Sequence, residues 1–231
     1  MSGALRDIAG WVSAWSRRRK LELFLRELRP TPETTVVDVG VTDTGFGEDA
    51  YGTHNFFEEL YPWPERITAV STQHLDRFAN AFPRVRAVRA DGRALPFADG
   101  QFDLGFSNAV LEHVGDREAQ QAFVQELCRV ARRVFLATPN RAFPLEVHTL
   151  LPFVHWLPKR PRERIYRALG RDEGLGVELL GPRELLRLFP AGTNPRLVQR
   201  GMSLVVIAGP DRRKSAWPMP RTSGGVPSQE Q

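Results

Sequence analysis

Cysteine is scarce in this sequence, with Cys128 alone among 231 residues. A single thiol excludes a disulfide within the chain and a metal site built from several cysteines. Long apolar runs are missing as well: the longest, at 204–208, is the length of a strand, whereas a membrane span needs about 18 apolar residues. Residues 1–15 lack the basic, apolar and small-residue pattern of a signal peptide. We therefore expect a soluble, cytoplasmic protein.

The net charge of +5 is concentrated at the two ends of the chain. Residues 1–29 hold seven Lys and Arg against three Asp and Glu, and residues 211–231 hold four against two. The part between them therefore carries a net charge of −1. Enzymes that act on nucleic acids usually place their positive charge on the domain face that meets the phosphates. We expect no nucleic-acid partner.

The first 29 residues contain two groups of apolar side chains at helical spacing, and the two groups are out of phase with each other. The groups are Ile8, Trp11, Val12 and Trp15, then Leu21, Phe24, Leu25 and Leu28. This pattern predicts two short amphipathic helices, or one bent helix, ending before Pro30. The basic run at 17–20 fits a helix packed on the domain with this run solvated. It also fits contact with anionic lipid or an acidic partner.

From residue 30 onward, short apolar segments alternate with helical ones. Five of these segments read as strands, at 34–40, 66–71, 85–91, 102–108 and 132–139. Asp116 is placed to cap a helix between the last two, and two further strands meet at Gly201 in a predicted antiparallel hairpin. The sequence thus predicts an α/β fold over 30–210. We expect a Rossmann-like open sheet, mostly parallel with an antiparallel C-terminal edge hairpin and helices on both faces, followed by a disordered tail at 211–231.

Ligands of an open parallel sheet bind beyond the carboxyl ends of its strands, so the residues that follow each strand are the ones to inspect. Residues 89–116 read RADGRALPFADGQFDLGFSNAVLEHVGD, and a helix and RVARRVFLATPN come next. In this order of elements the chain resembles the class I S-adenosylmethionine-dependent methyltransferases, in the branch that includes enzymes of small molecules, glycans and lipids. The resemblance covers roughly residues 34–140.

The resemblance implies a set of residues that bind S-adenosylmethionine. Asp91 would accept a hydrogen bond from the adenine amine, and backbone groups next to it would donate to the ring nitrogens. Asp38 and Gly40 would approach the amino-acid part, and Asn108 would lie beside the methyl group. The full set is Asp38, Gly40, Thr42, Ser71, Asp91, Gly92, Arg93 and Asn108.

Two positions depart from the family pattern. Thr42 stands where the glycine-rich turn usually has its second glycine, and Ser71 stands where a carboxylate usually binds both ribose hydroxyls. A hydroxyl binds a diol more weakly than a carboxylate does. Asp43, Glu48 or Asp49 from the following loop are alternatives for that role.

The candidate catalytic residues are His148 and His113. His113 follows the fourth strand by about one helical turn, and a histidine hydrogen-bonded to a loop is an equally good interpretation of it. His148 lies with Glu146 and His155 in a segment, 138–170, that we expect to cover the acceptor. His54 and His74 are expected on the surface. No His or Cys pair has the spacing of metal ligands, so no metal site is predicted.

These observations favour S-adenosylmethionine-dependent methyl transfer to a small-molecule, glycan- or lipid-type acceptor. The departures at Thr42 and Ser71 leave open a non-catalytic binding or scaffold protein with a degenerate cofactor site. A nicotinamide oxidoreductase is disfavoured because no G-x-G-x-x-G follows the first strand. Contact with a membrane surface through the basic segments also stays open.

Overall fold

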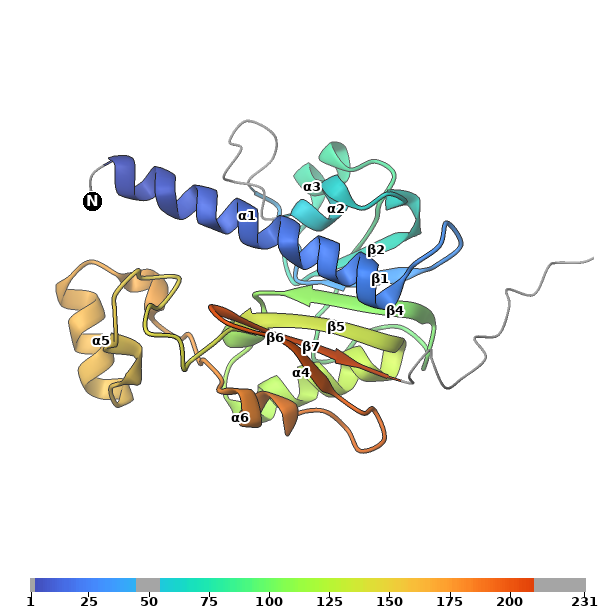
Figure 1. The fold of residues 1–231 in the computed structure, drawn as a ribbon. Coiled ribbons are helices and arrows are strands. Elements are labelled where there is room, and N and C mark those ends of the chain that lie inside the picture. Colours follow the sequence, from blue (N-terminus) through green and yellow to red (C-terminus); the bar gives the residue numbers. More distant parts are fainter. Residues whose placement is uncertain (1–2, 45–54, 210–231) are drawn as a thin grey trace, which may run out of the picture.

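The computed structural model describes residues 3–44 and 55–209. Within these ranges seven strands form one sheet in the order β3-β2-β1-β4-β5-β7-β6 (Figure 1). The strands are β1 (Val36–Val39), β2 (Ile67–Ser71), β3 (Arg86–Arg89), β4 (Phe102–Asn108), β5 (Ala131–Pro139), β6 (Arg196–Arg200) and β7 (Ser203–Ala208). β1 to β5 are parallel, whereas β7 is antiparallel to both β5 and β6. The predicted fold class is therefore confirmed.

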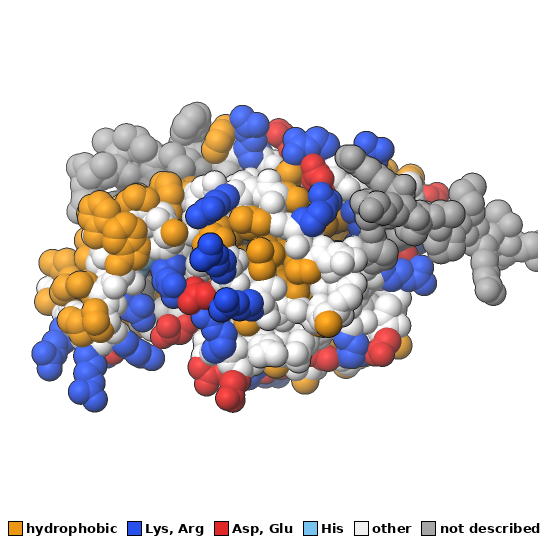
Figure 2. All heavy atoms as spheres, turned by 60° about the horizontal axis from the view of Figure 1, so that its bottom comes forward, with side chains coloured by type: hydrophobic (Ala, Val, Ile, Leu, Met, Phe, Trp, Pro, Cys, Tyr) orange, Lys and Arg blue, Asp and Glu red, His pale blue; other side chains and the backbone are white. Residues whose placement is uncertain are grey.

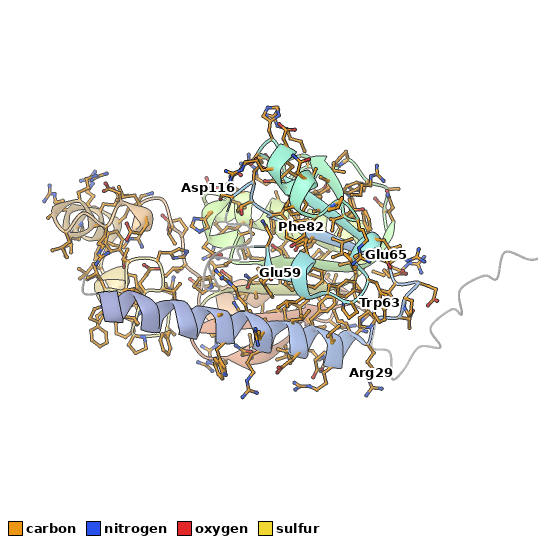
Figure 3. All side chains as sticks on the ribbon, turned by 90° about the horizontal axis from the view of Figure 1, so that it is seen from above. Arg29, Glu59, Trp63, Glu65, Phe82 and Asp116 are labelled. Atoms are coloured by element: carbon orange, nitrogen blue, oxygen red, sulfur yellow. The ribbon has the colours of Figure 1, made fainter. Side chains whose placement is uncertain are left out.

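Helices cover both faces of the sheet (Figure 1). One face carries α1 (Gly3–Leu28), α2 (Phe56–Leu60) and α3 (Asp76–Ala81), and the other carries α4 (Arg117–Val130) and α6 (Pro182–Leu186). The parallel strands point toward the end of the molecule where α5 (Lys159–Ala168) lies, between two 3-10 turns, η3 (Val154–Trp156) and η4 (Asp172–Gly174). In Figure 3, Arg29 and Trp63 lie at the end where β1 and β2 begin, and Asp116 lies toward the opposite end.

Alternate side chains of the central strands pack into two separate cores. On β5, Val134 and Leu136 join the core that includes Phe123 of α4, whereas Phe135 and Ala137 join the core that includes residues of α1 and α2. This alternation follows from the pleat, because successive side chains of a strand point to opposite faces. A strand buried on both faces reads as a continuous apolar run, which is why β5 is visible in the sequence.

The N-terminal segment forms one continuous helix, α1, so the alternative of two separate helices is wrong. Its C-terminal half packs on the sheet, where Phe24 is fully buried and meets Phe57, Phe106 and Phe135 edge to face. The expectation that the basic run at 17–20 is solvated is also wrong in part. Lys20 is buried, because its position on the helix faces the sheet. Neither α1 nor another described helix combines the length and apolarity that crossing a membrane requires.

The helix predicted after Asp116 is α4, and it begins as expected. The Asp116 carboxylate accepts a hydrogen bond from the backbone N–H of Ala119 at 3.0 Å, which satisfies one of the free amides of the first turn. Phe123, Leu127 and Val130 of this helix are buried against the sheet. The helix thereby holds the segment between β4 and α4 at the carboxyl edge.

Replacing Phe24 by alanine tests whether α1 is part of the domain. The ring is fully buried, so we expect Phe24→Ala to lower the free energy of unfolding by about 3–5 kcal/mol. Urea denaturation measures this, with Trp15→Ala on the same helix as the control. Trp15 is half exposed, and its loss should cost less than about 1 kcal/mol. Equal effects of the two substitutions would contradict the packing of α1.

Candidate functional site

A cavity of about 500 Å³ opens at the carboxyl ends of β1 to β4, and we call it the main pocket. Six of the eight residues predicted to bind the cofactor line it, contributed by the ends of three different strands. They are Gly40, Thr42, Ser71, Asp91, Gly92 and Arg93. Ala109, Val110, His113 and Phe123 complete its β4 and α4 side. The strand ends thus converge as expected for an open parallel sheet.

Gly40 turns the chain out of β1 with a φ of +117°, a conformation open to glycine. A Cβ at this position would collide with the side chain of Val110 from beyond β4. Gly92 is equally confined, since a Cβ there would overlap the ring of Phe123. The main pocket therefore depends on close approach of backbone at both glycines.

At the end of β3, Asp91 holds its neighbour Arg93 in a two-pronged ion pair, with the shortest N–O distance 2.6 Å. The hydrogen bonds from Arg93 lower the pKa of Asp91, so the carboxylate stays ionised. The backbone N–H of Arg93 also donates to Asp91, at 2.8 Å. In this structure the N–H is thus held by the Asp91 turn, and its predicted role toward a ring nitrogen stays a prediction.

The β2 side of the main pocket has no carboxylate among the described residues that line it. Ser71, Thr72 and Gln73 stand there, and the Gln73 side chain accepts a hydrogen bond from the backbone of Asp43 at 3.1 Å. Asp43 caps the backbone N–H of Phe78 at 2.7 Å, which leaves it poorly placed to replace the missing ribose partner. Glu48, Asp49, His54, Gly45 and Gly47 lie outside the described residues.

Asn55, which the sequence analysis missed, shapes the turn after β1. Its amide oxygen accepts from the Thr42 backbone N–H at 3.0 Å, and its amide nitrogen donates to the Thr42 carbonyl at 2.9 Å. This pair of bonds holds the backbone at Thr42, the position where the family usually has a glycine. In the sequence, the only sign that Asn55 could close this loop is that its amide can both donate and accept hydrogen bonds.

Asp38 and Asn108 line a second, much smaller cavity instead of the main pocket. Asp38 is buried beside Glu58, and burial raises the pKa of both carboxyls, that of Glu58 to about 7. The Asn108 amide oxygen accepts from Lys20 Nζ at 2.8 Å, and burial lowers the pKa of that ammonium to about 8. The side chain of Asn108 is thus engaged with α1.

A cluster of two carboxylates and two imidazoles lies where β4, β5 and the following segment meet; we call Glu112, His113, Glu146 and His148 the His–carboxylate cluster. His148 Nδ1 lies 2.6 Å from Glu146, and His148 Nε2 lies 3.9 Å from Glu112. The rings of His113 and His148 meet edge to face with centroids 4.9 Å apart. The structure thus brings together the two histidines predicted to be catalytic, 35 positions apart in the sequence.

Burial and hydrogen bonds shift the pKa values of the residues in the His–carboxylate cluster in opposite directions. Burial opposes ionisation of Glu146, but hydrogen bonds from His148 and Thr149 outweigh it and lower the pKa of Glu146 to about 2. Burial likewise disfavours the cationic form of His148, yet its bond to Glu146 prevails and raises its pKa. Burial and the nearby His148 lower the pKa of His113, and burial raises that of Glu112. Such opposed shifts within one cluster are typical of functional sites.

The remaining histidines of the described chain lie outside this cluster. His155 is buried, with Nε2 3.1 Å from the Arg141 carbonyl, so the structure gives it a packing role in the segment after β5. His74 is exposed and contacts Arg89 at 2.9 Å, as expected for a surface position. Glu112 was missed by the sequence analysis, although it stands beside His113 in the VLEHV run that carried the resemblance.

Residues 49–134 match the protein family described as Methyltransferase domain. The matched part contains the ends of β2, β3 and β4 and the whole of α4. No curated protein matches the sequence. The family match and the fold confirm the resemblance to class I S-adenosylmethionine-dependent methyltransferases, while the branch stays a prediction.

Solved structures share the fold at low sequence identity. A protein from Pyrococcus horikoshii OT3 is 16% identical with a TM-score of 0.54, over 84% of this chain and 90% of that one. The geranyl diphosphate C-methyltransferase from Streptomyces coelicolor A3(2), solved with Mg²⁺, geranyl diphosphate and S-adenosyl-L-homocysteine, is 14% identical with a TM-score of 0.50, over 83% and 79%. The [4+2]-cyclase SpnF is 13% identical with a TM-score of 0.50, over 79% and 57%. Fold alone therefore does not decide the reaction.

Proposed function

We propose that this chain binds S-adenosylmethionine in the main pocket and transfers its methyl group to an acceptor held at the His–carboxylate cluster. The observation that carries this is the main pocket itself, whose 500 Å³ lies within the about 300–1,000 Å³ typical of small-molecule sites. Its lining residues from β2 to α4 fall within the methyltransferase match at 49–134, and those from the end of β1 precede it. The relative from Streptomyces coelicolor, which was solved with S-adenosyl-L-homocysteine, has the same fold.

The residues of the site fit the parts of this cofactor. The Asp91 carboxylate is ionised and partly exposed, so it can accept a hydrogen bond from the adenine amine beside its pair with Arg93. Asp38 and Glu58 line the small second cavity, which meets the main pocket at Gly40 and Val41, so their carboxyl oxygens would be within reach of the ammonium of the amino-acid part. Ser71 and Thr72 present hydroxyls to the ribose, a weaker contact than a carboxylate provides.

In the reaction the bound cofactor supplies a methyl group on a cationic sulfur. The acceptor atom forms the new bond to the methyl carbon while the sulfur–carbon bond breaks, and the sulfur keeps the electron pair. The chain's part is to align acceptor and methyl group and to receive or shield charge at the acceptor. His113 is suited to this because it borders both the main pocket and His148.

Replacing Asp91 tests the cofactor half of the proposal. We expect Asp91→Ala to weaken S-adenosylhomocysteine binding by about 1–3 kcal/mol, the usual cost of losing a hydrogen-bond partner. Isothermal titration calorimetry measures it, with Asp99→Ala as the control. Asp99 is exposed, pairs with Arg129 and does not line the main pocket. Arg93→Ala, which leaves the Asp91 carboxylate in place, should keep most of the affinity. Unchanged affinity in Asp91→Ala would remove this residue from the site.

Replacing His148 tests the acceptor half. The side chain does not line the main pocket, so we expect His148→Ala to keep S-adenosylmethionine affinity within about twofold while turnover falls about 10²-fold or more. The control is His74→Ala, since His74 is exposed and distant from the cluster in the sequence. Loss of cofactor binding in folded His148→Ala would contradict this division of the pocket. Cofactor binding by the natural chain with no turnover on any acceptor would favour a binding or scaffold protein.

We further propose a lipid-type acceptor, reached at a membrane surface by the segment 138–170. Phe153, Trp156 and Leu157 are 55%, 50% and 40% exposed, and Figure 2 shows hydrophobic side chains gathered at this end of the molecule with Lys and Arg beside them. Arg160 and Arg164 of α5 are exposed as well. Aromatic side chains flanked by basic ones suit the interface of an anionic bilayer.

Vesicle sedimentation tests this placement. We expect the protein to sediment with vesicles that contain phosphatidylglycerol and to stay in solution with vesicles of phosphatidylcholine alone, because the basic side chains attract anionic lipid. The double substitution Phe153→Ala, Trp156→Ala should reduce the bound fraction several-fold. Leu60→Ala is the control, since Leu60 is 40% exposed on α2. Equal sedimentation of all three proteins would argue against a lipid surface.

A further inference from the structure

The His–carboxylate cluster contains an arrangement that methyl transfer does not by itself require. Glu112 and His113 belong to the 3-10 turn η2 (Leu111–His113) that follows β4, and His148 comes from the segment after β5. One ligand atom from each of the three lies within 4.8 Å of the other two. The spacing of these residues along the sequence did not predict that they meet, because His148 belongs to a different segment from Glu112 and His113.

Glu112 provides the first independent sign that a cation belongs here. The residue is completely buried, and its Oε2 accepts a hydrogen bond from the Thr138 hydroxyl at 2.9 Å. Its Oε1 has no hydrogen-bond partner among the described residues. A buried carboxylate oxygen without a partner is costly. Lys20 lies near enough to influence Glu112, but its ammonium donates to Asn108.

The orientation of His148 provides the second sign. Glu146 accepts at one oxygen from the backbone of His148 at 3.0 Å and at the other from the backbone of Thr149 at 2.7 Å, so it acts as an acceptor. His148 Nδ1, 2.6 Å from Glu146, therefore carries the proton, and the lone pair of Nε2 is directed elsewhere. Nε2 faces Glu112 Oε1 at 3.9 Å, too far for a hydrogen bond. A carboxylate that fixes a histidine in this way is the usual support of a metal-binding imidazole.

We propose that Glu112, His113 and His148 bind one divalent transition-metal cation, with Zn²⁺ as the reference ion. Two imidazoles and one carboxylate with open positions are a ligand set that Zn²⁺, Mn²⁺ and Fe²⁺ accept. Two ligands about 2.1 Å from a tetrahedral zinc lie about 3.4 Å apart, so His148 and Glu112 must approach by about half an ångström. His113, which is exposed, has the freedom to complete the set.

The location gives such a cation a role at the acceptor. His113 lines the main pocket and His148 belongs to the segment after β5, so the cation would lie at the side of the main pocket where we place the acceptor. A Lewis acid at this point lowers the pKa of an acceptor hydroxyl and holds its oxygen toward the methyl group. This role rests on the proposed function, whereas binding of the cation does not.

Isothermal titration calorimetry, in which ZnCl₂ is added to chelator-treated protein, tests the site. We expect one Zn²⁺ per chain, and we expect Glu112→Gln and His148→Gln each to weaken binding by about tenfold or more. Glu146→Gln removes only the support of His148 and should weaken binding by about 10–100-fold. His74→Gln is the matched control and should bind as the natural chain does.

The outcome separates the cation site from the proposed function. Thermal melts establish that each variant is folded, and S-adenosylhomocysteine is titrated into the same metal-free samples. Zn²⁺ binding that is absent, or that is equal in the natural chain and in a folded Glu112→Gln, His148→Gln double variant, would overturn the site. If S-adenosylhomocysteine still binds in that case, the cofactor proposal stands without the metal. Zn²⁺ binding lost in the double variant, with no S-adenosylhomocysteine binding anywhere, would leave the metal site and remove the cofactor.

Discussion

Parallel pairing of β1 with β4 determines where this protein can bind a ligand. β1 also pairs with β2, so the order of strands reverses beside it, and the connections from β1 and β4 leave toward opposite faces of the sheet. A crevice opens at such a reversal, beyond the carboxyl ends of the strands. Gly40 from β1 and Ala109 from β4 enter it with φ of +117° and +57°. Strain at a non-glycine residue such as Ala109 is typical of positions that a binding site constrains.

Several ionisable side chains are buried along this same edge, and each costs stability there. Lys20, Asp38, Glu58 and Glu112 are all buried. Desolvation disfavours the charged form of each, as their shifted pKa values indicate. Apolar residues of similar size would often make such positions more stable. Ligand binding therefore explains the buried ionisable residues at the carboxyl edge better than a contribution to folding stability does.

The sequence predicted the fold well because its central strands are buried on both faces. Segments such as 102–108 and 132–139 are therefore rich in apolar residues, and β4 and β5 lie within one residue of those bounds. The N-terminal helix was harder, since two stripes out of phase suggested a break that α1 does not have. The C-terminal stripe of α1 is the one that packs on the sheet, with Leu21, Phe24 and Leu28 buried.

The site was predicted in part for a similar reason. Strand ends converge by topology, and the family resemblance singled out Gly40, Ser71 and Asp91 among the residues that follow the strands; all three line the main pocket. Contacts between distant segments follow no such rule, which is why the bond from Lys20 to Asn108 and the approach of His148 to Glu112 were missed. Both depend on how α1 and the segment after β5 pack on the sheet. The spacing of histidines and carboxylates in the sequence does not contain that information.

The central claim is that the main pocket is built for S-adenosylmethionine, and binding of ligands to the natural chain tests it most directly. Calorimetric titration with S-adenosylhomocysteine, S-adenosylmethionine and NAD compares the candidates under one condition. We expect both sulfur compounds to bind at one site per chain and NAD not to bind. Binding of NAD without either sulfur compound, or binding of none of the three, would contradict it.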